Sequence, residues 1–189
     1  MALPTVAIQK KCAPLLVVVM GVSGTGKTTL GNKIADYFDI AFLDADSLHS
    51  QAAIQQMSQG IALTDEQRLP WIQRICRQLS QFESQGKHCV LAYSGLKQQH
   101  RQRIFSTYPH TFGILLNVEK SDKSLIETRL HTRTHHFMSP QLLSSQIAAM
   151  EPFGDEITLL NLSLTESLAS HLLQSVNLIK LHYSGCSNV

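Results

Sequence analysis

Short apolar runs alternate with longer amphipathic stretches along most of this chain. Residues 15–20 are apolar, rich in valine and without polar alternation, which is typical of a strand buried on both faces of a sheet. The runs at residues 40–43, 89–93, 112–118 and 157–162 are also short and predominantly apolar. The pattern therefore predicts five strands.

The stretches between these runs show the three- and four-residue spacing of amphipathic helices. Helices are predicted at residues 27–38, 47–57, 121–130 and 140–150, and two more after Thr64 and after Ser163. Thr64 with Gln67, and Ser163 with Glu166, match the capping box that begins many helices. Pro70 indicates that the helix after Thr64 kinks or restarts there. Because strands and helices alternate, we expect a parallel sheet covered by helices on both faces.

The length and the apolar content fit one domain. The chain has 189 residues, of which 43% are apolar, enough for a substantial core. We place the domain at residues 14–180, between an N-terminal arm at 1–13 and a C-terminal tail at 181–189. Residues 131–138 are polar and rich in histidine, so they offer little apolar surface for packing. We predict that this segment is a small mobile lid on a three-layer α/β fold.

Charge and cysteine usage exclude some classes of protein. Lys and Arg total 16, Asp and Glu total 14, and the basic residues are spread along the chain, which is unlike a nucleic-acid-binding or membrane-surface protein. No apolar run approaches the roughly 18 residues of a membrane span. The four cysteines have no C-x-x-C spacing, which favours a reducing compartment such as the cytoplasm. A homodimer is an assembly that the sequence leaves open.

A phosphate-binding loop follows the first predicted strand. Residues 21–28 read G-V-S-G-T-G-K-T and match G-x-x-x-x-G-K-[ST] in full, between a strand and a helix. The glycines let backbone N–H groups approach phosphate oxygens, and the helix N-terminus adds partial positive charge. Lys27 can reach the β- and γ-phosphates, and the Thr28 hydroxyl can bind Mg²⁺. The predicted ATP-binding residues of the loop are Gly21, Val22, Ser23, Gly24, Thr25, Gly26, Lys27, Thr28 and Thr29.

Two aspartates end the second predicted strand. Ligands of doubly wound sheets bind at the carboxyl ends of the strands, so Asp44 and Asp46 are expected near the phosphate loop. One carboxylate can hold Mg²⁺, for which we choose Asp44, and the other can hydrogen-bond or deprotonate a substrate hydroxyl, for which we choose Asp46. Solvated aspartates in a turn are the simpler alternative.

Several ordered segments resemble the gluconokinase family, within the shikimate-kinase-like group of P-loop kinases. The resemblance covers roughly residues 15–180 and begins with the form of the phosphate loop. Residues 42–49 resemble F-L-D-x-D-x-L-H, and residues 57–71 resemble M-x-x-G-x-x-L-x-D-x-x-R-x-P-W. The remaining matches are Ser94-Gly95-Leu96-Lys97 with Arg101, the lid-like residues Arg129, Arg133, His136 and Phe137, and the pairs Ser145-Gln146 and Glu151-Pro152.

The resemblance implies a P-loop kinase fold and an activity. The reaction would be phosphorylation of D-gluconate to 6-phospho-D-gluconate with ATP and Mg²⁺. Lys27, Asp46 and Arg133 would be catalytic, and Arg129 would cover ATP. The acceptor would contact Asp46, His49, Arg68, Lys97 and Arg101. Three of these are cations, which would bracket a small anion, and arginine suits a planar carboxylate.

The chain departs from the family pattern on the acceptor side. Ala45, Ser50, Ala53, Gln56, Tyr93 and His100 stand where the family usually has other residues, and the segment at 151–156 is one residue short. A kinase of another small hydroxylated acid or of a nucleotide is therefore an alternative that a substrate panel would separate. A non-catalytic ATP-binding protein is another alternative, which any detectable turnover removes.

Overall fold

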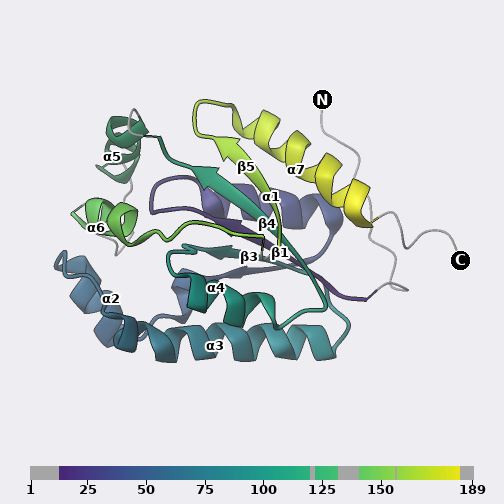
Figure 1. Cartoon of the computed structure of the whole chain (residues 1–189), viewed down its shortest axis with the longest axis horizontal. Coiled ribbons are helices and arrows are strands. Elements are labelled where there is room, and N and C mark those ends of the chain that lie inside the picture. Colours follow the sequence, from purple (N-terminus) through teal and green to yellow (C-terminus); the bar gives the residue numbers. More distant parts are fainter. Residues whose placement is uncertain (1–12, 120–121, 132–140, 156, 184–189) are drawn as a thin grey trace, which may run out of the picture.

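The fold is given by a computed structural model that describes residues 13–119, 122–131, 141–155 and 157–183. Its centre is a parallel sheet of five strands in the order β2-β3-β1-β4-β5, as Figure 1 shows. The strands are β1 Leu15–Met20, β2 Ala41–Asp44, β3 Cys89–Tyr93, β4 His110–Asn117 and β5 Thr158–Ser163. The prediction of a five-stranded parallel sheet is confirmed.

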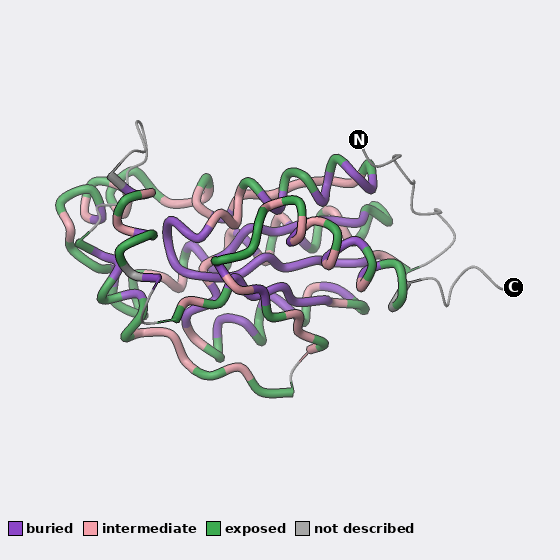
Figure 2. The backbone as a smooth tube through the Cα atoms, turned by 90° about the horizontal axis from the view of Figure 1, so that it is seen from above, coloured by how far each residue is buried: buried purple, intermediate pink, exposed green. Residues whose placement is uncertain are grey.

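Strand β1 lies in the middle of the sheet. Val18 pairs with Leu91 of β3 on one side and with Gly113 of β4 on the other. Every residue of β1 is buried, which explains the run of large apolar side chains without alternation. Figure 2 shows that the buried parts of the backbone gather in the middle of the molecule and the exposed parts around them. Because the chain leaves β1 toward β2 on one side and returns to β4 on the other, the crevice beyond the end of β1 is the expected ligand site.

Helices cover both faces of the sheet and gather at the ends of the strands. They are α1 Lys27–Phe38, α2 Gln51–Ser58, α3 Asp65–Ser84, α4 Gln98–Phe105, α5 Lys123–His131, α6 Leu142–Ala149 and α7 Leu168–Tyr183, with a 3₁₀ helix η1 at Ala45–Leu48. In Figure 1, α1 and α7 lie above the sheet, α3 and α4 lie below it, and α2, α5 and α6 lie beyond the arrowheads.

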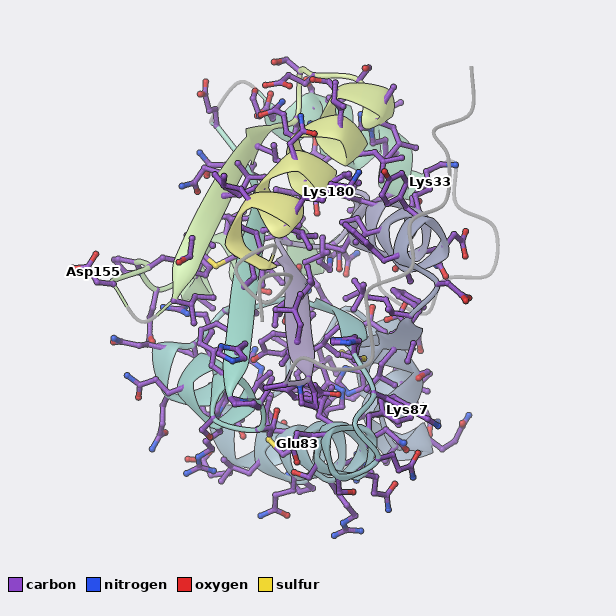
Figure 3. The ribbon with its side chains drawn as sticks, turned by 90° about the vertical axis from the view of Figure 1, so that its right-hand side faces the viewer. Lys33, Glu83, Lys87, Asp155 and Lys180 are labelled. Carbon is purple, nitrogen blue, oxygen red and sulfur yellow. The ribbon has the colours of Figure 1, made fainter. Side chains whose placement is uncertain are left out.

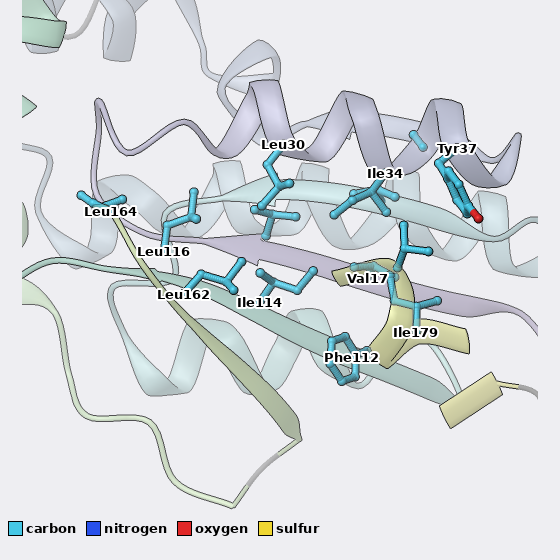
Figure 4. Close-up of a cluster of buried hydrophobic side chains, with 14 of the residues drawn as sticks. Val17, Leu30, Ile34, Tyr37, Phe112, Ile114, Leu116, Leu162, Leu164 and Ile179 are labelled. Carbon is cyan, nitrogen blue, oxygen red and sulfur yellow. The ribbon is translucent and has the colours of Figure 1, made fainter. Parts of the chain in front are cut away.

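The core has two halves that β1 divides. Val17 and Val19 face α1 and α7, where Leu30 and Ile34 contribute to one apolar cluster (Figure 4). The intervening residues of β1 face a second cluster, to which α3 contributes Ile75. This alternation is the period of a strand with an apolar layer on each side. Burial of both clusters fixes the sheet rigidly, so the loops at its carboxyl edge have a firm base.

Many charged side chains lie at the periphery, although Arg101 is fully buried. Figure 3 shows Lys33, Glu83, Lys87, Asp155 and Lys180 around the outside of the layers. Lys180 of α7 reaches across to α1 and donates a hydrogen bond to the Tyr37 hydroxyl at 2.7 Å. Among the helices of the described ranges, none combines the length and the apolar content that a membrane span requires.

One of the two predicted capping boxes forms and the other does not. Thr64 and Gln67 form the predicted capping box, and α3 then continues as one helix through Pro70. The second predicted box is wrong, because β5 continues through Ser163, and it is the Ser167 hydroxyl that accepts from the Ser170 N–H at the start of α7. Helix α7 also extends beyond the predicted end of the domain at residue 180.

Helix α4 was not predicted. Its buried face carries two polar residues, His100 and Arg101, together with Ile104 and Phe105, so the sequence shows no apolar stripe there. Of the predicted lid, residues 132–138 lie outside the described residues, so its mobility stays a prediction.

Candidate active site

The phosphate loop connects β1 to α1. Gly26 adopts φ 100° immediately before the helix, and Gly24 adopts φ 84°, conformations that side chains other than glycine rarely take. A Cβ at Gly24 would also lie 2.8 Å from Ile126 of α5. The Val22 carbonyl accepts hydrogen bonds from the Thr25 hydroxyl and from Lys27 Nζ, both at 2.9 Å. The loop is therefore folded by its own side chains, with Lys27 held across it.

Thr28 and Asp44 meet beside the loop. The Thr28 hydroxyl donates to Asp44 Oδ2 at 2.9 Å, and Asp44 Oδ1 accepts from the Asp46 backbone N–H at 3.0 Å. Both predicted metal ligands thus lie together at the start of α1, with hard oxygen donors of the type that Mg²⁺ prefers. The residues fit a Mg²⁺ ion bound to nucleotide phosphates, which keeps several water ligands.

A pocket lies between the phosphate loop and helices α2, α3 and α6. It is lined by Ser23, Lys27, Asp46, His49, Met57, Ala62, Leu63, Arg68, Trp71, Ser94, Leu96, Leu142, Ser145 and Gln146. Five predicted site residues from three separate segments are therefore brought together: Ser23, Lys27, Asp46, His49 and Arg68. The enclosed space is small, about 40 Å³.

His49 lies flat against Trp71 in this pocket. The two ring centroids are 4.2 Å apart and the planes are inclined by 15°. Burial, followed by the positive charges of Arg74 and Arg68, lowers the pKa of His49 from 6.5 to about 4, and Asp44 opposes this shift. His49 is therefore neutral at pH 7, and a neutral imidazole can both donate and accept a hydrogen bond with hydroxyl groups.

Helix α3 fixes the turn that carries the acidic residues. Trp71 Nε1 donates to the Ala45 carbonyl at 2.7 Å, and Arg74 Nε donates to the Leu48 carbonyl at 2.7 Å. Both carbonyls belong to η1, the 3₁₀ helix directly after Asp44. The turn is thus attached at both ends to a rigid helix, which holds Asp46 at the pocket.

Two predicted acceptor-binding cations carry ion pairs. Arg68 Nη1 lies 2.7 Å from Asp65 Oδ1, and the Arg68 side chain is 15% exposed at the pocket. Lys97 Nζ lies 3.1 Å from Glu151 Oε1 and 4.0 Å from Asp65 Oδ2. The remaining Glu151 oxygen, Oε2, accepts from the Gln98 N–H at 2.7 Å, where α4 begins. Arg68 lines the pocket, whereas Lys97 links the start of α4 to the segment after α6.

Arg101, another predicted acceptor-binding cation, is engaged in hydrogen bonds within the fold. The residue is fully buried and is not among the residues that line the pocket. Its guanidinium donates to the carbonyls of Gly95, Leu96, Glu151 and Pro152, and it lies 4.1 Å from the centroid of the Phe153 ring. Both terminal nitrogens of Arg101 are thus engaged within the fold, and its role in acceptor binding stays a prediction.

A second cavity, of about 350 Å³, lies on the other side of the phosphate loop. Its lining residues are Gly24, Thr25, Gly26, Thr29, Leu30, Leu116, Arg129, Glu166, Leu168 and His171. The predicted ATP-binding residues Thr29 and Arg129 meet here, and the volume lies in the ordinary range for small-molecule sites. Arg133, the predicted catalytic lid residue, lies outside the described residues.

Some pocket residues had no assigned role in the sequence analysis. The sequence analysis included Trp71, Ser94 and Gln146 only as members of segments that resemble the family. Leu168 and His171 of the second cavity carried no functional signal at all. Their positions depend on how α6 and α7 pack at the carboxyl edge of the sheet, which no local pattern expresses.

Comparisons with known proteins agree with this geometry. The AAA domain family matches residues 16–153. The thermosensitive gluconokinase of Escherichia coli (strain K12) is 36% identical over 154 residues, which are 81% of this chain and 81% of that protein. Among solved structures, a sugar kinase from Janibacter sp. HTCC2649 has a TM-score of 0.82 at 30% identity, covering 90% of this chain and 97% of its own.

A gluconokinase from Sinorhizobium meliloti 1021 is similar over an even larger share of this chain. Its TM-score is 0.78 at 30% identity, and the match covers 94% of this chain and 98% of that protein. The sequence match thus covers 81% of the chain, and the two structural matches cover 90% and 94% of it. The chain belongs to the gluconokinase family of P-loop kinases.

Proposed function

We propose that this protein transfers the γ-phosphoryl group of ATP to the primary hydroxyl of D-gluconate, giving 6-phospho-D-gluconate and ADP. The observation that carries the proposal is that Lys27 of the phosphate loop, Asp46 and Arg68 line one pocket. A phosphate cradle, a carboxylate for a hydroxyl group and a cation for a carboxylate are the three elements that this reaction needs.

Asp46 is proposed to orient the acceptor hydroxyl. In the transfer, the hydroxyl oxygen forms a bond to the γ-phosphorus while the bond to the bridging oxygen of ADP breaks, and the hydroxyl proton leaves toward Asp46. Lys27, which also lines the pocket, stabilises the charge on the transferring group. Mg²⁺, bound through Thr28 and Asp44, would neutralise phosphate charge. Arg133 is proposed as a further stabilising charge, and Arg129 as a contact of ATP.

The acceptor end is proposed to rest on Arg68 and His49. Arg68 offers two parallel N–H groups to the sugar-acid carboxylate, which then competes with Asp65 for the guanidinium. His49, neutral because of its surroundings, exchanges hydrogen bonds with hydroxyl groups along the chain of the acid. The sparse cysteines favour the cytoplasm as the place of action.

A coupled ADP-release assay across sugar acids, shikimate and nucleoside monophosphates tests the proposal. We expect gluconate to have the highest kcat/KM, and Asp46→Asn to lower kcat by 100-fold or more while calorimetry shows unchanged binding of an ATP analogue. A preference for another acceptor would show that Ala45, Ala53 and Gln56 mark a changed specificity. Equal loss of ATP affinity in Asp46→Asn would contradict the role of Asp46.

A further inference from the structure

A buried side chain of α6, Gln146, contacts the phosphate loop. The Ser23 backbone N–H donates to Gln146 Oε1 at 2.7 Å, and Gln146 Nε2 donates to the Ser23 hydroxyl at 3.3 Å. Gln146 is 8% exposed and Ser23 is 5% exposed, so water competes little for these bonds. The two residues are 123 positions apart in the sequence. A paired amide of this kind specifies one relative placement of helix and loop.

Ser23 occupies a particular place in the loop. It lines the acceptor pocket together with Lys27 and Asp46, whereas Thr25 and Gly26 line the cavity on the other side. The loop residues around Ser23 are fixed from within, since Thr25 and Lys27 both donate to the Val22 carbonyl. Ser23 is fixed from outside, by Gln146. The part of the loop that faces the acceptor therefore depends on α6 for its position.

We propose that Gln146 is a positioning residue for phosphoryl transfer, which holds the Ser23 side of the phosphate loop in line with the acceptor pocket. The inference rests on the proposed function, because it assumes transfer from the loop to an acceptor in that pocket. A misplacement of about 1 Å can cost roughly 100-fold in rate when the reacting groups must be aligned. Loss of the amide therefore lowers kcat by roughly 10- to 100-fold without a similar effect on the acceptor KM.

A competing interpretation predicts the opposite change in nucleotide affinity when Gln146 is replaced. If Gln146 only occupied the Ser23 N–H until a phosphate oxygen displaced it, its removal would eliminate a competitor, and nucleotide binding would become tighter. If Gln146 positions the loop, its removal leaves a less ordered loop, and nucleotide binding is unchanged or weaker. The affinity for a non-hydrolysable ATP analogue, measured by calorimetry, separates these cases without any turnover.

The variants are chosen to keep the volume of the side chain. Gln146→Met is unbranched and of similar length but loses both hydrogen bonds. Gln146→Glu keeps an acceptor for the Ser23 N–H, loses the donor and adds negative charge beside the phosphates, so it should also weaken the analogue. Ser144→Ala, at an exposed position of the same helix, is the matched control. Thermal unfolding and the amide resonance of Ser23 report whether the loop itself has changed.

We expect Gln146→Met to lower kcat for gluconate 10- to 100-fold, with the acceptor KM within 3-fold of wild type and analogue binding unchanged or weaker. Tighter analogue binding, or kcat within 2-fold of wild type, would overturn the inference. If wild type itself does not phosphorylate gluconate, the proposed function fails. The inference is then judged on the analogue and on the Ser23 resonance: displacement of that resonance in Gln146→Met with no gain in affinity supports it, and an unmoved resonance or tighter binding overturns it.

Discussion

Replacing Arg101 by methionine should destabilise the protein and leave acceptor binding almost unchanged. The guanidinium is fully buried and donates to four backbone carbonyls, from the segment before α4 and the segment after α6. Its two shortest bonds, to Pro152 at 2.6 Å and to Gly95 at 2.9 Å, join these segments. Removal of the charge leaves the carbonyls without their donor in a buried setting.

The size of the effect follows from these bonds. A hydrogen bond that involves a charged group contributes about 1.5–3 kcal/mol, so the two short bonds account for roughly 3–6 kcal/mol. Methionine preserves the burial of the apolar stem, and we take about 3 kcal/mol as the expected loss. In a chain of 189 residues this lowers Tm by roughly 6–12 °C. Arg103→Met, at an exposed position of the same helix, is the control and should change Tm by less than about 2 °C.

The assay pairs thermal unfolding with acceptor kinetics. Arg68→Met should show the opposite behaviour, because an ion pair such as Arg68–Asp65 contributes only about 0–1 kcal/mol to stability, while loss of the charge should raise the KM for gluconate by roughly 10- to 100-fold. An Arg101→Met protein with unchanged Tm and a gluconate KM raised 10-fold or more would refute the reasoning. In that case Arg101 would be an acceptor ligand, as the sequence alone predicted.

Further predictions concern the phosphate loop, the metal and pH. Lys27→Ala should lower kcat by at least about 100-fold while the Tm stays near that of wild type, and near-normal turnover by the folded variant would contradict the kinase assignment. Asp44→Asn should raise the Mg²⁺ concentration needed for half-maximal rate by roughly 10-fold in a titration, since the ion would lose a carboxylate ligand, whereas an unchanged titration would place the metal elsewhere. His49 takes up a proton at pH 6.5 when unfolded and at about 4 when folded, so the unfolded chain binds more protons between these values. Denaturant unfolding should therefore show stability falling as the pH drops through this window, and less so in His49→Gln.

The sheet could be predicted from the sequence because each strand is a local pattern. Residues of β1 are buried on both faces, so the apolar run alone indicates a central strand. The phosphate loop could also be predicted from the sequence, since its whole motif lies within eight consecutive residues. Helix α4 was not predicted because His100 and Arg101 occupy its buried face. With polar residues there, the sequence lacks the apolar periodicity that indicates a helix.

Some features of the site could not be predicted from the sequence, because they depend on contacts between distant segments. Arg101 carries the charge of a ligand-binding residue, and only its four carbonyl partners reveal that the fold uses it internally. The lowered pKa of His49 comes from its burial, where Trp71 stacks on the ring, and from the charges of Arg74 and Arg68, and local sequence does not place these α3 residues against it. The bond between Ser23 and Gln146 spans 123 positions. Contacts of this range follow from the packing of the elements and not from the pattern of any one of them.

The most direct measurement of the central claim is phosphorus NMR of the product formed from ATP and D-gluconate. The account predicts a phosphomonoester whose phosphorus couples to the two protons of the terminal CH₂ group, formed in equal amount to ADP. The signal should be absent with Lys27→Ala. A wild-type protein that releases ADP without a gluconate phosphoester, or that places the phosphate on a secondary carbon, would contradict it.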